Sequence, residues 1–233
     1  SNLISARTGI IKRFQRVEKD SSEPARPYIW WSEPANSGFT DTEDNKETAS
    51  SGKGMSPQEA QSSALGEAVE RYSAGRWNPS EVVYARRGNL KGESLDPRRM
   101  VLYAPDQYAD LPYAPYRDET TVGWVHARSL VSGNRVWVPA LAAFMNYTPQ
   151  SESEHLCPIT SNGLATGSTL LEAILKATFE VLERDAFMIT WLNRLPCRRI
   201  SLWRHPQADM IELCEAYRRR NVEIQLYLLP TDH

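Results

Sequence analysis

Two segments of the 233-residue chain carry acidic and basic side chains at the same spacing. The sequence Glu-x-x-Glu-Arg occurs at Glu67, Glu70 and Arg71, and again at Glu180, Glu183 and Arg184. If both segments are helical, the glutamates of each lie on one side of their helix, and Ser63 joins the first pair. Carboxylates suit hard divalent cations such as Mg²⁺, which often also binds nucleotide phosphates, and guanidinium groups match phosphate. The spacing therefore predicts a nucleotide site that contains Mg²⁺.

The two segments are also similar outside these charged residues. Aligning Glu67 with Glu180 places Gly54 on Gly167, Ser56 on Thr169, Glu59 on Glu172, Ala60 on Ala173 and Ala64 on Ala177. A hydroxyl residue followed three residues later by glutamate is a capping box, which marks the start of a helix. The sequence thus predicts helices from Pro57 to about Gly75 and from Thr169 to about Trp191.

A simpler interpretation exists for either helix alone. Surface glutamates at these spacings are commonly solvated and paired with Lys or Arg. However, Glu180 and Glu183 lie in an almost continuously apolar segment, so part of their face is expected to be buried or to line a cavity. Four converging carboxylates repel unless cations separate them, so a metal-free site should raise the pKa of at least one. We expect the Glu67 and Glu180 carboxyl groups to lie roughly 4 to 6 Å apart, as two ligands of one Mg²⁺ would.

The segments before the two helices are rich in glycine. Residues 51–54 contain Lys53 and residues 162–167 contain Asn162, so each offers backbone amides and one polar side chain near a helix N-terminus. Neither matches the Walker A sequence. Alone, residues 51–54 are better explained as a plain turn; beside the paired carboxylates, they favour a nucleotide site outside the P-loop class.

Composition excludes several classes of function. The chain has 27 Lys and Arg against 29 Asp and Glu, a net charge of −2, so neither nucleic acid nor a membrane surface is an expected partner. No apolar run reaches the roughly 18 residues of a membrane span. The three cysteines show no C-x-x-C spacing, and no signal sequence opens the chain. A cytoplasmic protein with free thiols is expected.

The remaining pattern predicts an α+β fold. Strands are expected at residues 28–31 and 81–85, a hairpin at 121–131 and 134–140, a helix at 206–220 and a strand at 221–229. Residues 32–56 and 149–160 are interpreted as loops, and residues 96–116 as ordered but irregular.

The final strand needs sheet neighbours, yet the chain ends four residues later. A single, truncated domain over residues 1–233 is therefore expected, with exposed strand edges or apolar surface that favour self-association. A complete domain that ends in an edge strand is the alternative.

The two helix segments, with the residues that precede them, resemble the two ATP-binding helices of the YcaO family. The similarity runs from Thr8–Ile11 through Val138–Ala140 to the end, and is closest in type to the azoline-forming cyclodehydratases of ribosomal peptide biosynthesis, including that of bacteriocins. It implies long helices packed on mixed or antiparallel sheets, and activation of a peptide backbone amide with ATP and Mg²⁺. The nucleophile would be a Cys, Ser or Thr of the substrate.

The resemblance also implies roles for individual residues. The ATP-binding positions are Lys53, Ser63, Arg71, Asn162, Glu172 and Arg184, and the metal-binding positions are Glu67, Glu70, Glu180 and Glu183. Helix capping explains Glu172 equally well. A further Arg and Glu of the family's nucleotide site have no counterpart here, and no catalytic residue is assigned.

The implied partners are a precursor peptide, a leader-peptide-binding protein or domain, and a second copy of the chain. Two alternatives stay open. The protein could instead form thioamides or assist in modifying a ribosomal protein, or it could be a non-catalytic scaffold that binds peptide.

Overall fold

The computed structural model describes residues 3–35, 49–100, 103–201 and 208–231. Its contacts divide the chain into two compact units, which are described separately: residues 1–72 with 162–233, and residues 73–161. Both contain antiparallel sheets, and the first also contains long helices, so the predicted α+β class is confirmed. Within the described ranges, no helix combines the length and the apolar composition that a membrane crossing requires.

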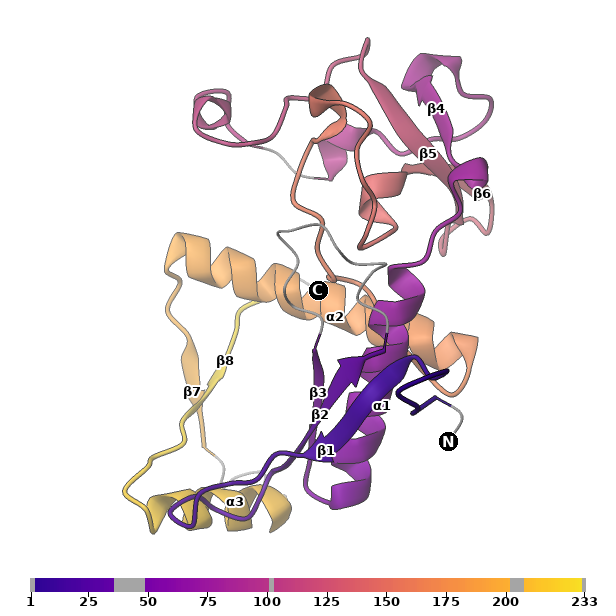
Figure 1. Ribbon diagram of the computed structural model, residues 1–233. Coiled ribbons are helices and arrows are strands. Elements are labelled where there is room, and N and C mark those ends of the chain that lie inside the picture. The colour runs from indigo at the N-terminus through magenta and orange to yellow at the C-terminus, as the bar shows by residue number, and fades with distance from the viewer. Residues whose placement is uncertain (1–2, 36–48, 101–102, 202–207, 232–233) are drawn as a thin grey trace. The chain divides into compact units, whose positions relative to one another are not determined.

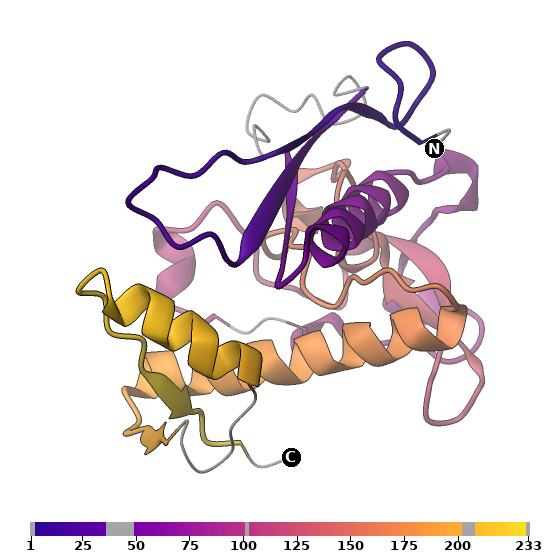
Figure 2. The same ribbon diagram turned by 90° about the horizontal axis from the view of Figure 1, so that it is seen from below.

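A three-stranded antiparallel sheet and a helix form the first half of the discontinuous unit. The strands are β1 (Ile11–Arg16), β2 (Tyr28–Pro34) and β3 (Ser50–Gly54), in that order, and the helix is α1 (Pro57–Ala74). Figures 1 and 2 show α1 beside the sheet in two perpendicular views. The approach is close, because a Cβ atom on Gly52 would lie 2.0 Å from the Ala64 backbone nitrogen. Glycine at this position therefore lets β3 pack directly on α1.

The predicted loop over residues 32–56 is wrong at both ends. Residues 32–34 belong to β2, and residues 50–54 form β3, while residues 36–48 lie outside the described ranges. The β3 sequence, Ser-Ser-Gly-Lys-Gly, has almost no intrinsic strand preference. Its conformation comes from non-local contacts: Gly52 pairs with Trp30 of β2, and the strand packs against α1. Strand β1, whose sequence Ile-Lys-Arg-Phe-Gln-Arg lacks the apolar–polar alternation typical of a strand, was not predicted either.

Both predicted capping boxes are confirmed. In α1, the Glu59 amide donates to Ser56 Oγ at 3.2 Å, and the Glu59 carboxylate accepts from the Ser56 amide. In α2 (Leu170–Asn193), the Glu172 amide donates to Thr169 Oγ1 at 3.2 Å, and the Glu172 carboxylate accepts from the Ser168 amide. The helix bounds agree with the sequence prediction to within two residues.

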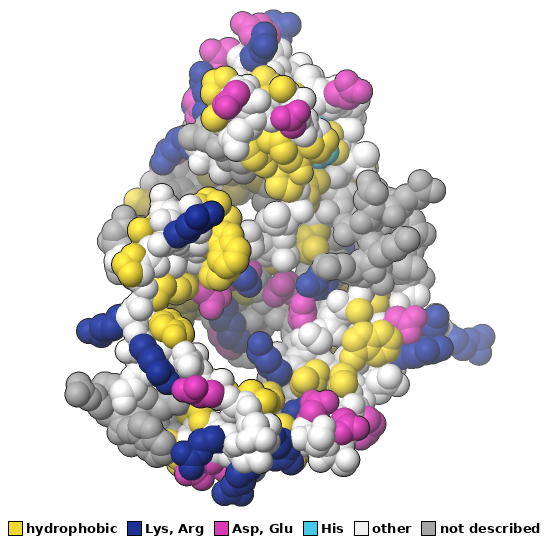
Figure 3. Space-filling view, turned by 90° about the vertical axis from the view of Figure 1, so that its left-hand side faces the viewer, with side chains coloured by type: hydrophobic (Ala, Val, Ile, Leu, Met, Phe, Trp, Pro, Cys, Tyr) yellow, Lys and Arg dark blue, Asp and Glu magenta, His cyan; other side chains and the backbone are white. Residues whose placement is uncertain are grey.

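Helix α2 exposes an unusual number of large apolar side chains. Trp191 and Leu192 are 69% and 70% exposed, and eight others, at 170, 171, 175, 179, 181, 187, 188 and 189, are at least 40% exposed. Figure 3 looks onto the C-terminal end of α2, where hydrophobic side chains lie at the surface. The apolar surface expected from the sequence is thus present, although it lies on α2.

The unit ends in strand β7 (Arg198–Ile200), helix α3 (Ala208–Arg218) and strand β8 (Leu226–Leu228), and the two strands pair antiparallel. The predicted helix over 206–220 is confirmed for residues 208–218; residues 219–220 form a turn, and residues 206–207 lie outside the described ranges. The predicted strand over 221–229 is too long. Asn221 has a φ of 60°, which ends the helix, and β7 offers only three residues for pairing.

The second unit contains the sheet β4 (Val83–Arg86), β5 (Thr121–Arg128) and β6 (Arg135–Pro139), in that order. The predicted hairpin is confirmed, with Gly133 at a positive φ in its turn. The core lies around β5, where Trp124 and Val122 are fully buried. Its apolar neighbours include Leu141 and Leu156.

A carboxylate lies inside this core. Glu154, on a single 3₁₀ turn within the predicted loop 149–160, is 1% exposed. It accepts hydrogen bonds from the Gly123 amide (2.6 Å), the Gln150 amide (2.7 Å) and the Tyr147 hydroxyl. Burial, together with the hydrogen bond to Glu154, also raises the pKa of Tyr147. The three hydrogen bonds thus offset the cost of burying this carboxylate, and they connect β5 with the loop and the turn that contains Glu154.

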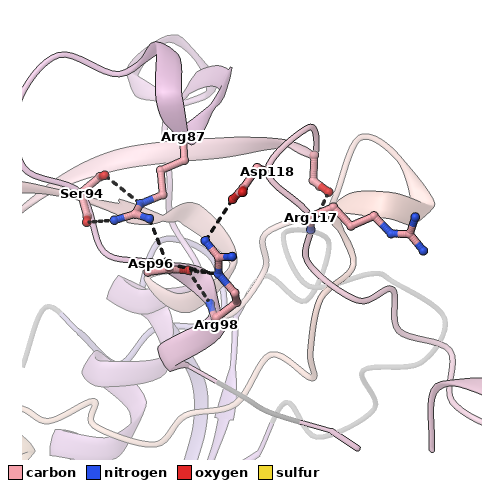
Figure 4. A network of polar contacts seen from close by, with 7 residues as sticks. Arg87, Ser94, Asp96, Arg98, Arg117 and Asp118 are labelled. Carbon is pink, nitrogen blue, oxygen red and sulfur yellow. Dashed lines mark hydrogen bonds and ion pairs between the residues drawn. The ribbon is translucent and has the colours of Figure 1, made fainter. Parts of the chain in front are cut away.

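A second polar network orders the irregular segment that begins at residue 96 (Figure 4). Arg87 donates to Asp96 at 2.9 Å and to the Ser94 hydroxyl at 3.1 Å. Arg98 bridges Asp96 at 2.9 Å and Asp118 at 3.0 Å. Hydrogen bonding from Arg98 holds the pKa of Asp96 below its usual value. Where it is described, this segment contains only short 3₁₀ turns, and ionic contacts hold it in place. This agrees with the prediction that residues 96–116 are ordered but irregular.

Candidate functional site

Glu67, on α1, is held by donors at both carboxylate oxygens. Arg71, one helical turn later, donates to Oε1 from Nε at 3.1 Å and from Nη2 at 2.8 Å. The backbone amide of Ser51, in β3, donates to Oε2 at 2.8 Å. The Glu67 and Arg71 side chains are 29% and 26% exposed. The carboxylate is therefore oriented jointly by its own helix and by the adjacent strand.

Glu70, one turn further along α1, has a pKa raised to about 7. Desolvation is the main cause, followed by the negative charges of Glu180 on α2 and Glu67 on α1, with partial compensation from Arg71. The two helices thus bring carboxylates close enough to repel each other. The prediction that at least one pKa of the group is raised is confirmed, and this electrostatic strain suits a site that takes up a cation.

The second helix supplies less buried groups. Glu180 is partly buried, whereas Glu183 and Arg184 are exposed, so the expected burial of this face holds for Glu180 alone. Within the described ranges, no three Asp, Glu, His or Cys side chains lie close enough to form a ready metal site. A cation shared by all four glutamates, with Glu67 close to Glu180, stays a prediction.

The other predicted residues lie around the two helices. Lys53 is exposed on β3, Ser63 is exposed on α1, and Asn162 is exposed at the start of the segment before α2. That segment approaches both helices: a Cβ atom on Gly66 of α1 would lie 3.0 Å from Thr166 Oγ1, and one on Gly163 would lie 3.0 Å from Val181.

Glu172 is engaged in capping its own helix. Its carboxylate accepts from the Ser168 amide at 2.8 Å and the Ser168 hydroxyl at 2.5 Å, and it pairs with Lys176 at 2.7 Å. The hydrogen bond with Lys176, together with those from Ser168, lowers the pKa of Glu172 to about 2. The structure therefore shows the capping role, and its predicted contact with ATP stays a prediction.

Comparison of the chain with models of known protein families shows which family has these two helices. The family model described as YcaO cyclodehydratase, ATP- and Mg²⁺-binding, matches residues 51–233, which include β3, α1 and α2. The chain belongs to the YcaO family. The ATP and Mg²⁺ expected from the sequence are thus the cofactors of its family, and the carboxylates of Glu70 and Glu180, with Arg71 close to Glu70, fit a cation and a phosphate.

Curated relatives of this YcaO chain are longer proteins. An uncharacterised protein of Methanothermobacter thermautotrophicus is 32% identical over 82% of the chain and 46% of its own length. An uncharacterised protein from the tfuA 3′ region of Rhizobium leguminosarum bv. trifolii is 28% identical over 78% of the chain and 42% of its own length. The chain thus spans less than half of the length of these two relatives.

Solved structures support the same fold. A heterocyclase in complex with substrate and cofactor superposes with a TM-score of 0.84 at 25% identity, over 99% of this chain and 33% of that one. YcaO from Methanopyrus kandleri, bound with AMPPCP and Mg²⁺, gives a TM-score of 0.67 at 22% identity, over 94% of this chain and 49% of that one. The predicted YcaO-like fold is therefore confirmed.

Sequence reasoning missed the contribution of Ser51, because a backbone amide has no residue signature. It also assigned Arg71 to ATP alone. The spacing of four residues between Glu67 and Arg71 is typical of a helical ion pair and was an available signal for their contact.

Proposed function

We propose that this protein uses ATP and Mg²⁺ to activate a backbone amide of a peptide, and that the reaction is cyclodehydration of Cys, Ser or Thr in a ribosomally made precursor. The observation that carries the proposal is the proximity of Glu70 on α1 to Glu180 on α2, where burial and the neighbouring negative charges both raise the pKa of Glu70 and a divalent cation would stabilise its ionised form. The family match, described as a cyclodehydratase, supports the same reaction class.

In this proposal each group has a distinct task. Glu67, Glu70, Glu180 and Glu183 would hold Mg²⁺, and Lys53, Ser63, Asn162 and Arg184 would contact the nucleotide. ATP supplies the phosphoryl group that converts the amide oxygen into a leaving group. The substrate peptide supplies the thiol or hydroxyl nucleophile, so the protein needs no nucleophilic residue of its own.

The test compares Glu180→Gln with Glu152→Gln, a change in the other unit at an exposed glutamate without a metal role. In the full-length protein with its cognate precursor, Glu180→Gln should abolish both ATP consumption and loss of water from the peptide, measured by phosphate release and mass spectrometry. Glu152→Gln should leave both intact. Retained turnover in Glu180→Gln would refute the proposal, and peptide binding without ATP consumption by the wild type would favour a scaffold.

A further inference from the structure

The arginine of the first helix has different surroundings from the arginine at the equivalent position in the second. Arg71 makes two charge-assisted hydrogen bonds with Glu67 Oε1, at 3.1 and 2.8 Å. Arg184 is exposed, and within the described part of the chain it makes no ion pair or side-chain hydrogen bond. The two arginines are equivalent in sequence, yet only Arg71 is engaged with a carboxylate.

The fold explains this difference. Strand β3 directly precedes α1, and its Ser51 amide donates to Glu67 Oε2 at 2.8 Å. Residues 162–167, which precede α2, contain no strand. Among the described residues, no hydrogen bond reaches the carboxylate of Glu180, the counterpart of Glu67. The first repeat therefore has a carboxylate held by both a strand and a helix, whereas among the described residues no hydrogen bond holds the corresponding carboxylate or guanidinium group of the second.

We propose that Arg71 is a positioning residue, which orients the Glu67 carboxylate for a divalent cation, in contrast to Arg184, whose partner expected from the family resemblance is the nucleotide. This inference rests on the proposed function. Arg71 and the Ser51 amide hold opposite oxygens of the carboxylate, so the group cannot rotate freely. Oε1 accepts two hydrogen bonds, whereas Oε2 accepts one and keeps a lone pair for a cation. Partners that orient a metal ligand in this way contribute strongly to metal affinity.

The geometry disfavours phosphate as the primary partner of Arg71. If Arg71 bound a phosphate through Nε or Nη2, it would lose its two charge-assisted hydrogen bonds to Glu67. The Glu67 carboxylate would then be unpaired beside Glu70, which already lies near the charge of Glu180. Arg184 has no such bonds to break. This is why the two arginines should respond differently to substitution.

The experiment measures metal and nucleotide binding separately, without turnover. Mn²⁺ binding to the full-length protein, followed by electron paramagnetic resonance, should weaken by about 10- to 100-fold in Arg71→Gln. Affinity for a non-hydrolysable ATP analogue, measured by calorimetry at saturating Mg²⁺, should stay close to wild type. Arg184→Gln should show the opposite result, with weakened nucleotide binding and unchanged Mn²⁺ affinity.

Two further variants control for structure and charge. Arg219→Gln removes another arginine paired with a glutamate four residues earlier, Glu215, on α3, and should change neither affinity. Arg71→Lys keeps the charge but not the two-donor geometry, so it should still bind Mn²⁺ less tightly than wild type. It also serves as the test variant if Arg71→Gln does not fold, as judged by circular dichroism.

The outcomes separate the two proposals. Unchanged Mn²⁺ affinity in Arg71→Gln and Arg71→Lys, or a loss of nucleotide binding at saturating Mg²⁺ in both, would overturn the positioning role and leave the proposed function intact. A wild-type chain that binds neither Mn²⁺ nor nucleotide would count against the proposed function, and the positioning role would fail with it.

Discussion

At Glu70, burial and two neighbouring carboxylates act in the same direction. Each disfavours the ionised form, and together they raise the pKa from 4.5 to about 7. A carboxyl group with such a pKa can lose its proton near neutral pH when a cation binds, because the cation stabilises the negative charge that burial and the neighbouring carboxylates disfavour. The stability of the metal-free protein should therefore depend on the protonation of this one side chain.

We predict that the metal-free protein loses stability as the pH rises from about 4.5 to about 7. In this window folded Glu70 retains the proton that the unfolded chain releases, so the unfolding free energy falls with increasing pH. Denaturant unfolding in EDTA at several pH values measures the effect. In Glu70→Gln, the fall in unfolding free energy across this pH window should be smaller by about 1 kcal/mol, a figure that allows for solvent screening. An identical pH profile in the variant would contradict the prediction.

The buried carboxylate of Glu154 leads to a second prediction at this scale. Glu154→Gln replaces an acceptor of three hydrogen bonds by a group with one acceptor oxygen and two new donors. We expect a loss of about 2 to 4 kcal/mol in unfolding free energy. Glu152→Gln, an exposed change on the same turn, should stay within about 0.5 kcal/mol of wild type. Equal effects would argue against the network.

At the scale of elements, predictability follows the range of the interactions. The start of α1 and of α2 depends on residues four or fewer apart, which is why Ser56 and Thr169 were informative. Strand β3 depends on a partner strand and on a helix, neither of which is visible in Ser-Ser-Gly-Lys-Gly. The proximity of Glu70 to Glu67 and Glu180 agrees with the spacing, whereas the Ser51 amide that holds Glu67 could not be predicted from it.

The contact between β3 and α1 can be tested with one methyl group. In Gly52→Ala, the new Cβ would meet the backbone of Ala60 and Ala64 within 2.4 Å, so the strand must move away from the helix. We expect a destabilisation of about 2 kcal/mol or more, measured by thermal or denaturant unfolding. Gly88→Ala, where a Cβ meets nothing within 4 Å, is the matched control. A neutral Gly52→Ala would show that the two elements are less tightly packed.

At the scale of the whole molecule, the exposed apolar residues of α2 favour association. Surfaces of this size and composition mark interaction sites or aggregation-prone regions. The self-association expected from the sequence stays a prediction, but the structure now indicates residues through which it would occur.

We predict that the apparent mass of the chain in light scattering rises with concentration, because water is released from the apolar face of α2 on association. The double variant Trp191→Ser, Leu192→Ser should reduce this rise. Leu130→Ser, which removes a side chain that is also 70% exposed but lies in the β5–β6 turn, should not. A wild-type chain that remains monomeric throughout the series would contradict the prediction.

The placement of residues 73–161 between the two parts of the other unit has a consequence during protein synthesis. A ribosome completes this continuous stretch before it has made any of α2, so the β4–β5–β6 sheet is available to fold early. The carboxylates of α1 meanwhile lack their partner on α2 until Glu180 has been added. Nucleotide or metal that requires both helices can therefore act as a folding ligand only after α2 has been made, when the nascent chain joins its two distant parts.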